Sequence, residues 1–429
     1  MASDSRSYLG IDLGTSGVRC MLISSSGAVL AEARTRLRET RASGHMQTQD
    51  PADWWLAFLD CLRQLAARHS LADVSDLCVD GTSGTTLLTD RYGRPLGPAL
   101  MYSDTRSPET ASRLLDKAPQ AASACSPSSA LLKAWWLMER YRKGDEPCYI
   151  QQQADWLLSR LRGTAGITDW NNALKLGYDT LAKTWPGWVS QLDWPDTALP
   201  VVVAPGTPIG MIDTAMAAET GLPRDTQLRA GTTDGVAAFL ASGAAQPGEA
   251  MTSLGSTLIL KVCSSRPVTS VVYGVYSHRL DEHRWLAGGA SNTGGAVLKK
   301  FFSETDLNEL SQRMQADSDT GLEYYPLPAS GERFPVMDPD KPPVMTPVPE
   351  DPARFLQGLF EGIARIEKTG YDLLERLGAD PVTSIRTTGG GAANPAWTKI
   401  RRRIVGRSLT TGLHAEAAYG AARLAAGLV

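Results

Sequence analysis

A short pattern of strand, glycine-and-hydroxyl turn and second strand occurs twice in this chain, and it limits the folds open to the sequence. The first copy places Gly14-Thr15-Ser16 after an apolar run that begins at Tyr8. The second copy places Gly255-Ser256-Thr257 between a strand pattern from Glu249 and an apolar strand from Leu258. A repeat this short can arise by chance, but duplication of one nucleotide-binding half would also leave it.

Helical patterns separate and follow these strands. Helices are expected where apolar residues recur at helical spacing, over residues 54–69, 129–141, 154–161, 355–377 and 415–428. Further strands are expected at 18–24, 28–37, 77–79 and 384–387, which predicts an α/β class with mixed sheets. A chain of 429 residues is too long for one core, so two domains are expected. The proline-rich stretch 324–352 is expected to be an extended surface excursion.

The composition is that of an ordinary globular protein and excludes several classes of partner. Apolar residues make up 42% and charged residues 21%, and the net charge is −3. No basic field therefore indicates nucleic acid or an acidic membrane surface as a partner. The polar residues 1–7 lack the apolar core of a signal peptide, and no stretch is long enough to cross a bilayer. A cytoplasmic enzyme or binding protein fits best.

Cysteine and histidine give little support for a metal or redox site. The six cysteines have neither metal-ligand nor redox-pair spacing and are expected to be small core residues: Cys20, Cys61, Cys78, Cys125, Cys148 and Cys263. His278 and His283 lie in a turn-like stretch, where a surface hairpin is favoured over a metal site.

The commoner phosphate-binding signatures are missing from the sequence. There is no G-x-x-x-x-G-K-[ST] motif, and residues 389–394 lack the third glycine of the dinucleotide fingerprint. The two turns at Gly14 and Gly255 instead combine backbone N–H groups with hydroxyls, which suits phosphate oxygens. Asp12 lies beside the first turn, and a carboxylate next to phosphates requires a cation such as Mg²⁺. Each turn alone could also be a plain hairpin corner.

Two further segments place an acid among small or hydroxyl residues. Asp234 follows Gly231-Thr232-Thr233 and precedes an alanine-rich helix, so it is either a simple helix N-cap or a base that accepts a sugar hydroxyl proton. The segment 79–86 crowds hydroxyls and Asp80 onto a turn, which favours a polyhydroxylated ligand, although a plain loop fits nearly as well.

Taken in order, these segments resemble the FGGY family of carbohydrate kinases, which includes glycerol, gluconate, xylulose and ribulose kinases. The segments that resemble family motifs are residues 11–16, 49–54, 90–96, 102–106, 155–157, 162–163, 169–173, 231–234, 253–257 and 388–397. Each motif alone is weak, but their occurrence in this order over nearly the whole chain is specific.

The resemblance implies the actin- and hexokinase-like (ribonuclease H-like) fold, with two α/β domains around a central cleft that would close over the substrates. It implies a sugar-binding domain over residues 1–242, joined by the final helix at 414–429, and a nucleotide-binding domain over 243–413. The implied partners are a small sugar and ATP or ADP with Mg²⁺, without nucleic acid or membrane, in a monomer or homodimer.

The resemblance also assigns roles to single residues. Asp12 would orient Mg²⁺ and lie at the substrate, and Asp234 would be the catalytic base. The nucleotide would be bound by Gly14, Thr15, Ser16, Gly255, Ser256, Thr257, Gly294, Gly390, Gly391, Asn394 and Trp397. Within this set Thr15, Ser256 and Thr257 would contact phosphates, and Gly390, Gly391 and Asn394 would hold adenosine. Trp397 would either stack on adenine or only pack.

The nature of the sugar is suggested by departures from other family members. Xylulose kinases usually carry a histidine in the turn that here reads Gly81-Thr82-Ser83-Gly84. Together with the short first domain and the segment 172–178, this resembles the compact D-ribulose kinase subgroup of cyanobacteria and plants. Ser83 is then expected to contact the sugar. Kinases of D-xylulose or other pentuloses and polyols, and a nucleotide-dependent switch or regulator without sugar turnover, remain alternatives.

Overall fold

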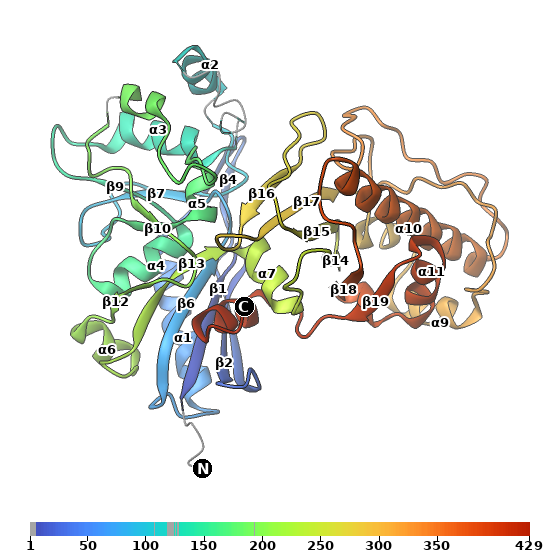
Figure 1. Cartoon of the computed structure of the whole chain (residues 1–429), viewed down its shortest axis with the longest axis horizontal. Coiled ribbons are helices and arrows are strands. Elements are labelled where there is room, and N and C mark those ends of the chain that lie inside the picture. The colour runs from blue at the N-terminus through green and yellow to red at the C-terminus, as the bar shows by residue number, and fades with distance from the viewer. Residues whose placement is uncertain (1–5, 107, 118–123, 125, 127, 193) are drawn as a thin grey trace. The chain divides into compact units, whose positions relative to one another are not determined.

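The computed structural model describes residues 6–106, 108–117, 124, 126, 128–192 and 194–429. The chain forms two compact units (Figure 1). The first unit comprises Met1–Ala241 with Glu416–Val429, and the second comprises Ser242–Ala415. The assignment of sugar to the first unit and nucleotide to the second stays a prediction.

A six-stranded mixed sheet forms the centre of the first unit. Its strands follow the order β12 (Pro208–Met211), β13 (Gln227–Thr233), β6 (Val74–Gly81), β1 (Ser7–Leu13), β2 (Gly17–Ser24) and β3 (Val29–Arg36). The neighbours β13, β6 and β1 run parallel, whereas β2, β3 and β12 pair antiparallel. All seven residues of β1 are buried, as expected of a central strand covered on both faces.

Among the described residues, the helices in the same unit as this sheet include the following five, and the last of them comes from the end of the chain. They are α1 (Pro51–Ala66), α4 (Gln153–Arg162), α6 (Thr214–Thr220), α7 (Asp234–Ser242) and α12 (Ala417–Ala425). The α12 helix packs on β1 so closely that a Cβ atom on Gly10 would lie 2.0 Å from the carbonyl oxygen of Ala418. A Cβ atom on Gly420 would lie 1.8 Å from the carbonyl oxygen of Ala237 in α7. Glycine at both positions therefore allows the backbones to touch.

Smaller elements complete the first unit. One sheet has the order β4 (Arg41–Ser43), β5 (Met46–Gln49), β8 (Ala99–Leu100), β7 (Thr86–Thr89) and β9 (Tyr149–Gln152), and β10 (Ile167–Asp169) pairs with β11 (Val201–Val203). The remaining helices are α2 (Pro108–Lys117), α3 (Ala130–Tyr141), α5 (Trp170–Leu174) and the 3-10 helix η2 (Gly187–Leu192).

The second unit is built on another six-stranded mixed sheet. Its order is β16 (Tyr276–Arg279), β17 (Trp285–Ser291), β15 (Leu258–Ser264), β14 (Glu249–Leu254), β18 (Ser384–Thr388) and β19 (Ser408–Thr411). Its helices are α8 (Gly295–Leu298), α9 (Glu304–Arg313), α10 (Pro352–Arg376), the 3-10 helix η3 (Gly390–Ala393) and α11 (Pro395–Val405).

The two sheets share one strand order. In the first unit the sequence of neighbours is β3-β2-β1-β6-β13, and in the second it is β17-β15-β14-β18-β19. In both, an antiparallel meander of three strands is extended by two parallel strands. This shared order agrees with the internal repeat predicted from the two glycine-and-hydroxyl turns.

Most elements expected from the sequence are present, and their ends move by a few residues. The long helix expected at 355–377 is α10 (Pro352–Arg376), and the strand expected at 77–79 is the longer β6 (Val74–Gly81). The α/β class is confirmed. Among the described residues, none of the helices combines the length and the apolar character needed to cross a bilayer.

Two detailed expectations are changed by the structure. The segment expected at 324–352 has no named helix or strand before α10 begins at Pro352, but it is not only a surface excursion, because Tyr324, Leu327 and Phe334 are buried in it. Residues 276–291 form the expected hairpin, yet His278 is buried in it whereas His283 is exposed. The five cysteines in the described part of the chain are buried free thiols, and Cys125 lies outside the described residues.

A buried acid at the start of α4 makes the stability of the first unit depend on pH. Asp155 accepts hydrogen bonds from the backbone N–H of Gln152 at 3.0 Å and from the Thr168 hydroxyl at 2.9 Å. Burial, and secondly the charge of Asp169, raise the pKa of Asp155 to about 8. An unfolded aspartate has a pKa of about 3.9. The folded chain therefore holds this proton over a pH range in which the unfolded chain has lost it.

We predict that Asp155→Asn weakens the pH dependence of unfolding. Because the folded state binds more protons than the unfolded state between about pH 4 and pH 8, the wild-type contribution of this group falls as pH rises through that window. In the asparagine variant the free energy of unfolding should fall less steeply with pH, by up to about 1.4 kcal/mol per pH unit. Urea unfolding at several pH values measures it, and an unchanged slope would contradict the raised pKa of Asp155.

Candidate functional site

Three aspartates meet at one edge of the first unit's sheet. In the parallel pairing of β1 with β6, Asp12 is the direct partner of Asp80. In the pairing of β6 with β13, Asp80 lies opposite Thr232, and Asp234 follows directly as the first residue of α7. The carboxyl ends of neighbouring parallel strands form the edge at which α/β proteins bind ligands. The sequence indicated Asp80 only as part of a hydroxyl-rich turn, and the strand register places it directly beside Asp12.

The close approach of these acids changes their protonation. Burial raises the pKa of Asp12 to about 6, the Arg19 guanidinium opposes the rise, and the charge of Asp234 adds to it. Arg19 Nη1 lies 2.8 Å from Asp12 Oδ2, and Arg19 Nε lies 3.0 Å from Glu416 Oε2. Burial first, and then the charges of Asp12 and Asp234, raise the pKa of Asp80 well above its usual range. This shift favours the protonated form of Asp80.

The first glycine-and-hydroxyl turn has a fixed backbone and accessible side chains. The Gly14 N–H donates to the Gly17 carbonyl at 3.0 Å, and the Leu37 N–H donates to the Ser16 carbonyl at 3.0 Å. The Gln49 amide donates to the Thr15 carbonyl at 2.8 Å. Thr15 is half-buried and Ser16 is exposed. Their hydroxyls are thus held at a constant place where an anion can reach them.

The turn that carries Ser83 is held by buried amides on both sides. Gln153 Oε1 accepts the Thr82 N–H at 3.1 Å, and Gln152 Oε1 accepts the Gly84 N–H at 2.9 Å. Ser83 Oγ itself is buried and has no hydrogen-bond partner among the described residues. Gln153 was not found from the sequence, because nothing in the helical pattern of residues 154–161 distinguishes it.

Other buried polar atoms in this region also lack a hydrogen-bond partner among the described residues. Gln153 Nε2 and Thr233 Oγ1 are likewise buried without a partner in the described part of the chain. The strand register places Thr233 opposite Gly81, and a Cβ atom on Gly81 would lie 3.3 Å from the Cβ atom of Gln153. Native structures leave few such groups unpaired, so a cluster of them requires an explanation.

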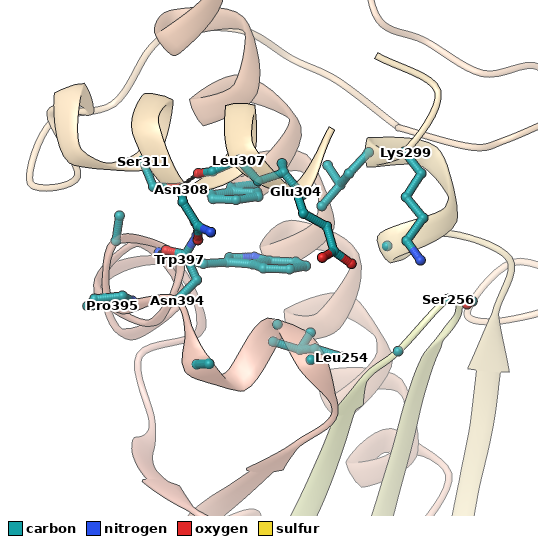
Figure 2. A pocket seen from close by; sticks show the side chains of 18 of the residues that line it. Leu254, Ser256, Lys299, Glu304, Leu307, Asn308, Ser311, Asn394, Pro395 and Trp397 are labelled. Carbon is teal, nitrogen blue, oxygen red and sulfur yellow. Dashed lines mark hydrogen bonds between the residues drawn. The ribbon is translucent and has the colours of Figure 1, made fainter. Parts of the chain in front are cut away.

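In the second unit a cavity of about 840 Å³ is bounded by the second glycine-and-hydroxyl turn, the Gly390 turn and helix α9. Figure 2 shows its side chains. The Gly295 N–H donates to the Gly255 carbonyl at 2.8 Å, and the Ala296 N–H donates to the Ser256 carbonyl at 3.0 Å. Gly294 has a φ of +136°, and a Cβ atom there would lie 2.8 Å from the Ser256 carbonyl oxygen. Glycine at 294 therefore allows this turn to close.

The predicted adenosine residues line the opposite part of this cavity. Asn394 caps α11 by accepting the Trp397 N–H at 3.0 Å, and its Nδ2 donates to Ser311 Oγ in α9 at 2.7 Å. Trp397 stacks on Phe360, with ring centroids 4.4 Å apart and an angle of 4° between the planes. A Cβ atom on Gly391 would lie 2.6 Å from the Trp397 ring. Trp397 thus packs in the core and also lines the cavity, and its stacking on adenine stays a prediction.

Other residues of the cavity were not found from the sequence. Lys299 follows α8, and Glu304 and Asn308 belong to α9, and all three line the cavity. Figure 2 shows the side chains of Lys299 and Glu304 extending toward its open space. Their helical surroundings carry no motif, so only the fold brings them to the glycine turns.

The predicted site residues fall into two groups, one on each unit. Asp12, Gly14, Thr15, Ser16, Ser83 and Asp234 belong to the first unit, and Gly255, Ser256, Thr257, Gly294, Gly390, Gly391, Asn394 and Trp397 belong to the second. The second group surrounds one cavity or its glycine turns. Among the residues that the structure describes, no three of histidine, cysteine, aspartate and glutamate are placed to hold a metal ion by themselves.

Comparisons with known proteins cover nearly the whole chain. Residues 7–241 match the sequence model of the N-terminal domain of the FGGY family of carbohydrate kinases, and residues 250–428 match that of its C-terminal domain. The xylulose kinase of Escherichia coli is 26% identical over 437 residues, which span 97% of this chain and 89% of the relative.

Solved structures show the same fold. The crystal structure of a xyloylose kinase from Brucella ovis superposes with a TM-score of 0.86 at 25% identity, and 99% of this chain and 91% of that chain are covered. Plasmodium falciparum glycerol kinase, solved with ADP, superposes with a TM-score of 0.85 at 18% identity over 99% of this chain and 89% of that chain. The predicted two-domain, actin- and hexokinase-like architecture is confirmed.

We predict that Gly390→Ala weakens ADP binding at least about tenfold, which corresponds to about 1.4 kcal/mol. A methyl group at this position meets no atom within 4 Å in the protein, so it should fill cavity space without destabilising the fold. Isothermal titration with ADP and thermal unfolding measure the two effects. Gly187→Ala in the first unit, which also has no atom within 4 Å of the added Cβ, is the control. Wild-type affinity in Gly390→Ala would remove Gly390 from the nucleotide site.

Proposed function

Because this chain belongs to the FGGY family of carbohydrate kinases, we propose that it transfers the γ-phosphate of ATP to D-ribulose, giving ADP and D-ribulose 5-phosphate. The observation that carries the sugar assignment is the cluster of unpartnered polar atoms beside the Ser83 turn. A ketose offers several hydroxyls and a carbonyl, which are the groups such atoms would pair with.

In the proposed reaction Asp234 is the base. A sugar hydroxyl oxygen forms a bond to the γ-phosphorus, the bond from that phosphorus to the β,γ-bridging oxygen breaks, and the hydroxyl proton passes to the Asp234 carboxylate. One carboxyl oxygen, Oδ1, accepts the Gly235 N–H at 2.7 Å, which fixes the side chain at the start of α7. A weak base is sufficient where the transition state is loose and the proton leaves late.

The residues around Asp12 fit a Mg²⁺ ion that travels with the nucleotide. Asp12 supplies a carboxylate beside the Thr15 turn, and the described residues offer no group of three side chains that would hold a metal without the nucleotide. Mg²⁺ commonly takes one or two carboxylates and completes its ligands with water and phosphate oxygens. When bound, it would neutralise charge on the phosphates. In the proposal the Ser256 turn binds phosphate and the Gly390 side of the cavity binds adenosine.

The choice of D-ribulose follows from the turn itself. Asp80-Gly81-Thr82-Ser83-Gly84-Thr85 carries no histidine, unlike the turn that is usual in xylulose kinases, and Ser83 Oγ is the hydroxyl left without a partner. D-xylulose is the second candidate, because a relative matched over 97% of this chain is a xylulose kinase. The two ketopentoses differ only in the orientation of one hydroxyl group.

We predict that D-ribulose gives the fastest ADP release with ATP and Mg²⁺ in a panel with L-ribulose, D-xylulose, ribitol and glycerol. A coupled ADP assay measures each rate. Ser83→Ala should raise the KM for D-ribulose about fivefold to tenfold, the effect of one lost hydrogen bond. A faster reaction with D-xylulose would keep the kinase and overturn the D-ribulose assignment. Slow hydrolysis that no sugar increases would favour a nucleotide-dependent switch instead.

We predict that Asp234→Ala lowers kcat by about 10²- to 10⁴-fold, the usual contribution of a general base, and leaves ADP affinity unchanged. Asp213→Ala is a matched control, because Asp213 caps α6 in the same unit through the N–H groups of Ala215 and Met216. If both variants lose similar activity, Asp234 acts only as a helix cap. Turnover like wild type in Asp234→Ala would exclude it as the base.

A further inference from the structure

A lysine is buried in the first unit where an apolar side chain would be expected. Lys133 lies in α3 between Leu132 and Ala134, and only 1% of it is exposed. Burying an ammonium group is unfavourable unless its donors are paired. Burial lowers the pKa of Lys133 to about 7, against an opposing effect of Asp104. A charge kept at such a position needs a structural or functional reason.

The ammonium group joins two loops that are far apart in the sequence. Lys133 Nζ donates to the carbonyl of Gly84 at 2.8 Å and to the carbonyl of Tyr102 at 3.1 Å. A second link runs in parallel, because the Tyr102 N–H donates to Thr85 Oγ1 at 3.2 Å. The loop from Tyr102 is itself anchored by Asp104, which accepts the backbone N–H of Gln47 at 2.7 Å.

The first of these loops is the turn that carries Ser83. Gly84 has a φ of +86°, its N–H is held by Gln152, and its carbonyl is held by Lys133 and by the Thr86 hydroxyl. The peptide group before Ser83 is also held, because the Thr82 carbonyl accepts the Thr85 N–H at 3.2 Å, whereas Ser83 Oγ has no partner among the described residues. A binding group is effective when its surroundings hold it in place before the ligand arrives.

We propose that Lys133 is a positioning residue of the sugar site, which fixes Ser83 Oγ by joining the Ser83 turn to the loop from Tyr102. This rests on the proposed function for the identity of the ligand. Lys133 acts through the Gly84 carbonyl and does not contact the sugar. Its effect on sugar binding should therefore depend on the presence of the Ser83 hydroxyl.

The test is a double-mutant cycle of Lys133→Met and Ser83→Ala in the full chain. With D-ribulose, Lys133→Met should raise KM about tenfold when Ser83 is present and less than about twofold in the Ser83→Ala background. The Kd for ADP should stay unchanged in all variants. Lys143→Met, at an exposed lysine just beyond the end of α3, is the matched control. An equal rise of KM in both backgrounds would show a general structural effect and overturn the proposal.

Hydrogen exchange of the ligand-free protein tests whether Lys133 links the two loops, and this test does not depend on which sugar binds. Lys133→Met should speed exchange in residues 82–86 and 102–106 together, while β1 and β6 stay protected. Thr85→Val, which removes the parallel link at similar volume, should produce the same pattern if Lys133→Met does not fold. An unchanged exchange rate in both segments would overturn the proposed link between the Ser83 turn and the loop from Tyr102. A wild type that phosphorylates no sugar in the panel, with the exchange pattern present, would instead overturn the proposed function.

Discussion

The parallel pairing of β1, β6 and β13 is the constraint on which the chemistry of the first unit depends. Its register sets Asp12 against Asp80 and delivers Asp234 to the same edge. A slip by one residue would turn Asp12 to the opposite face of the sheet and bring the larger side chains that alternate with it to the face on which Gly10 touches α12. Leu9, Ile11 and Leu13 are completely buried, so the core opposes such a slip. Hydrophobic packing therefore holds the three acids together against their mutual repulsion.

The repulsion is relieved by charge and by protonation. Asp12 is compensated by Arg19 on the neighbouring strand β2, and Arg19 is compensated in turn by Glu416, just before α12. Glu416 thus supports the strand pair beside the first glycine-and-hydroxyl turn electrostatically, while Gly10 and Gly420 let the backbone of α12 approach β1 and α7. Burial is the main cause that raises the pKa of Asp80, and the shift favours its uncharged form. This explains physically why the end of the chain returns to the first unit.

Sequence patterns predicted the parts of the structure that are local. The strands and turns around Gly14 and Gly255 follow from residues adjacent in the chain, and so do α1 with its Asp50-Pro51 start and the positions of Asp12 and Asp234. Contacts between distant segments could not be predicted, because periodicity does not reveal them. Gln153 and Lys133 look like ordinary helix residues, and their importance comes from the Ser83 turn, about 50 or more residues earlier in the chain. Phe334 likewise appears to belong to a surface segment until its burial is seen.

A buried polar network in the second unit is paired, in contrast to the cluster of buried polar atoms around Ser83 in the first unit. In the second unit Arg401 and Glu367 are fully buried but paired through two hydrogen bonds of 2.6 and 2.7 Å, with Thr252 and Thr387 completing the network. Such a satisfied network joins α10 and α11 to the sheet. In the first unit Ser83 and Gln153 have buried polar atoms that find no partner among the described residues. Each unpaired buried group costs about 1–3 kcal/mol, so folding alone would not favour this cluster. A ligand that supplied the missing partners would recover that free energy on binding, which is the physical basis of the role proposed for the Ser83 turn.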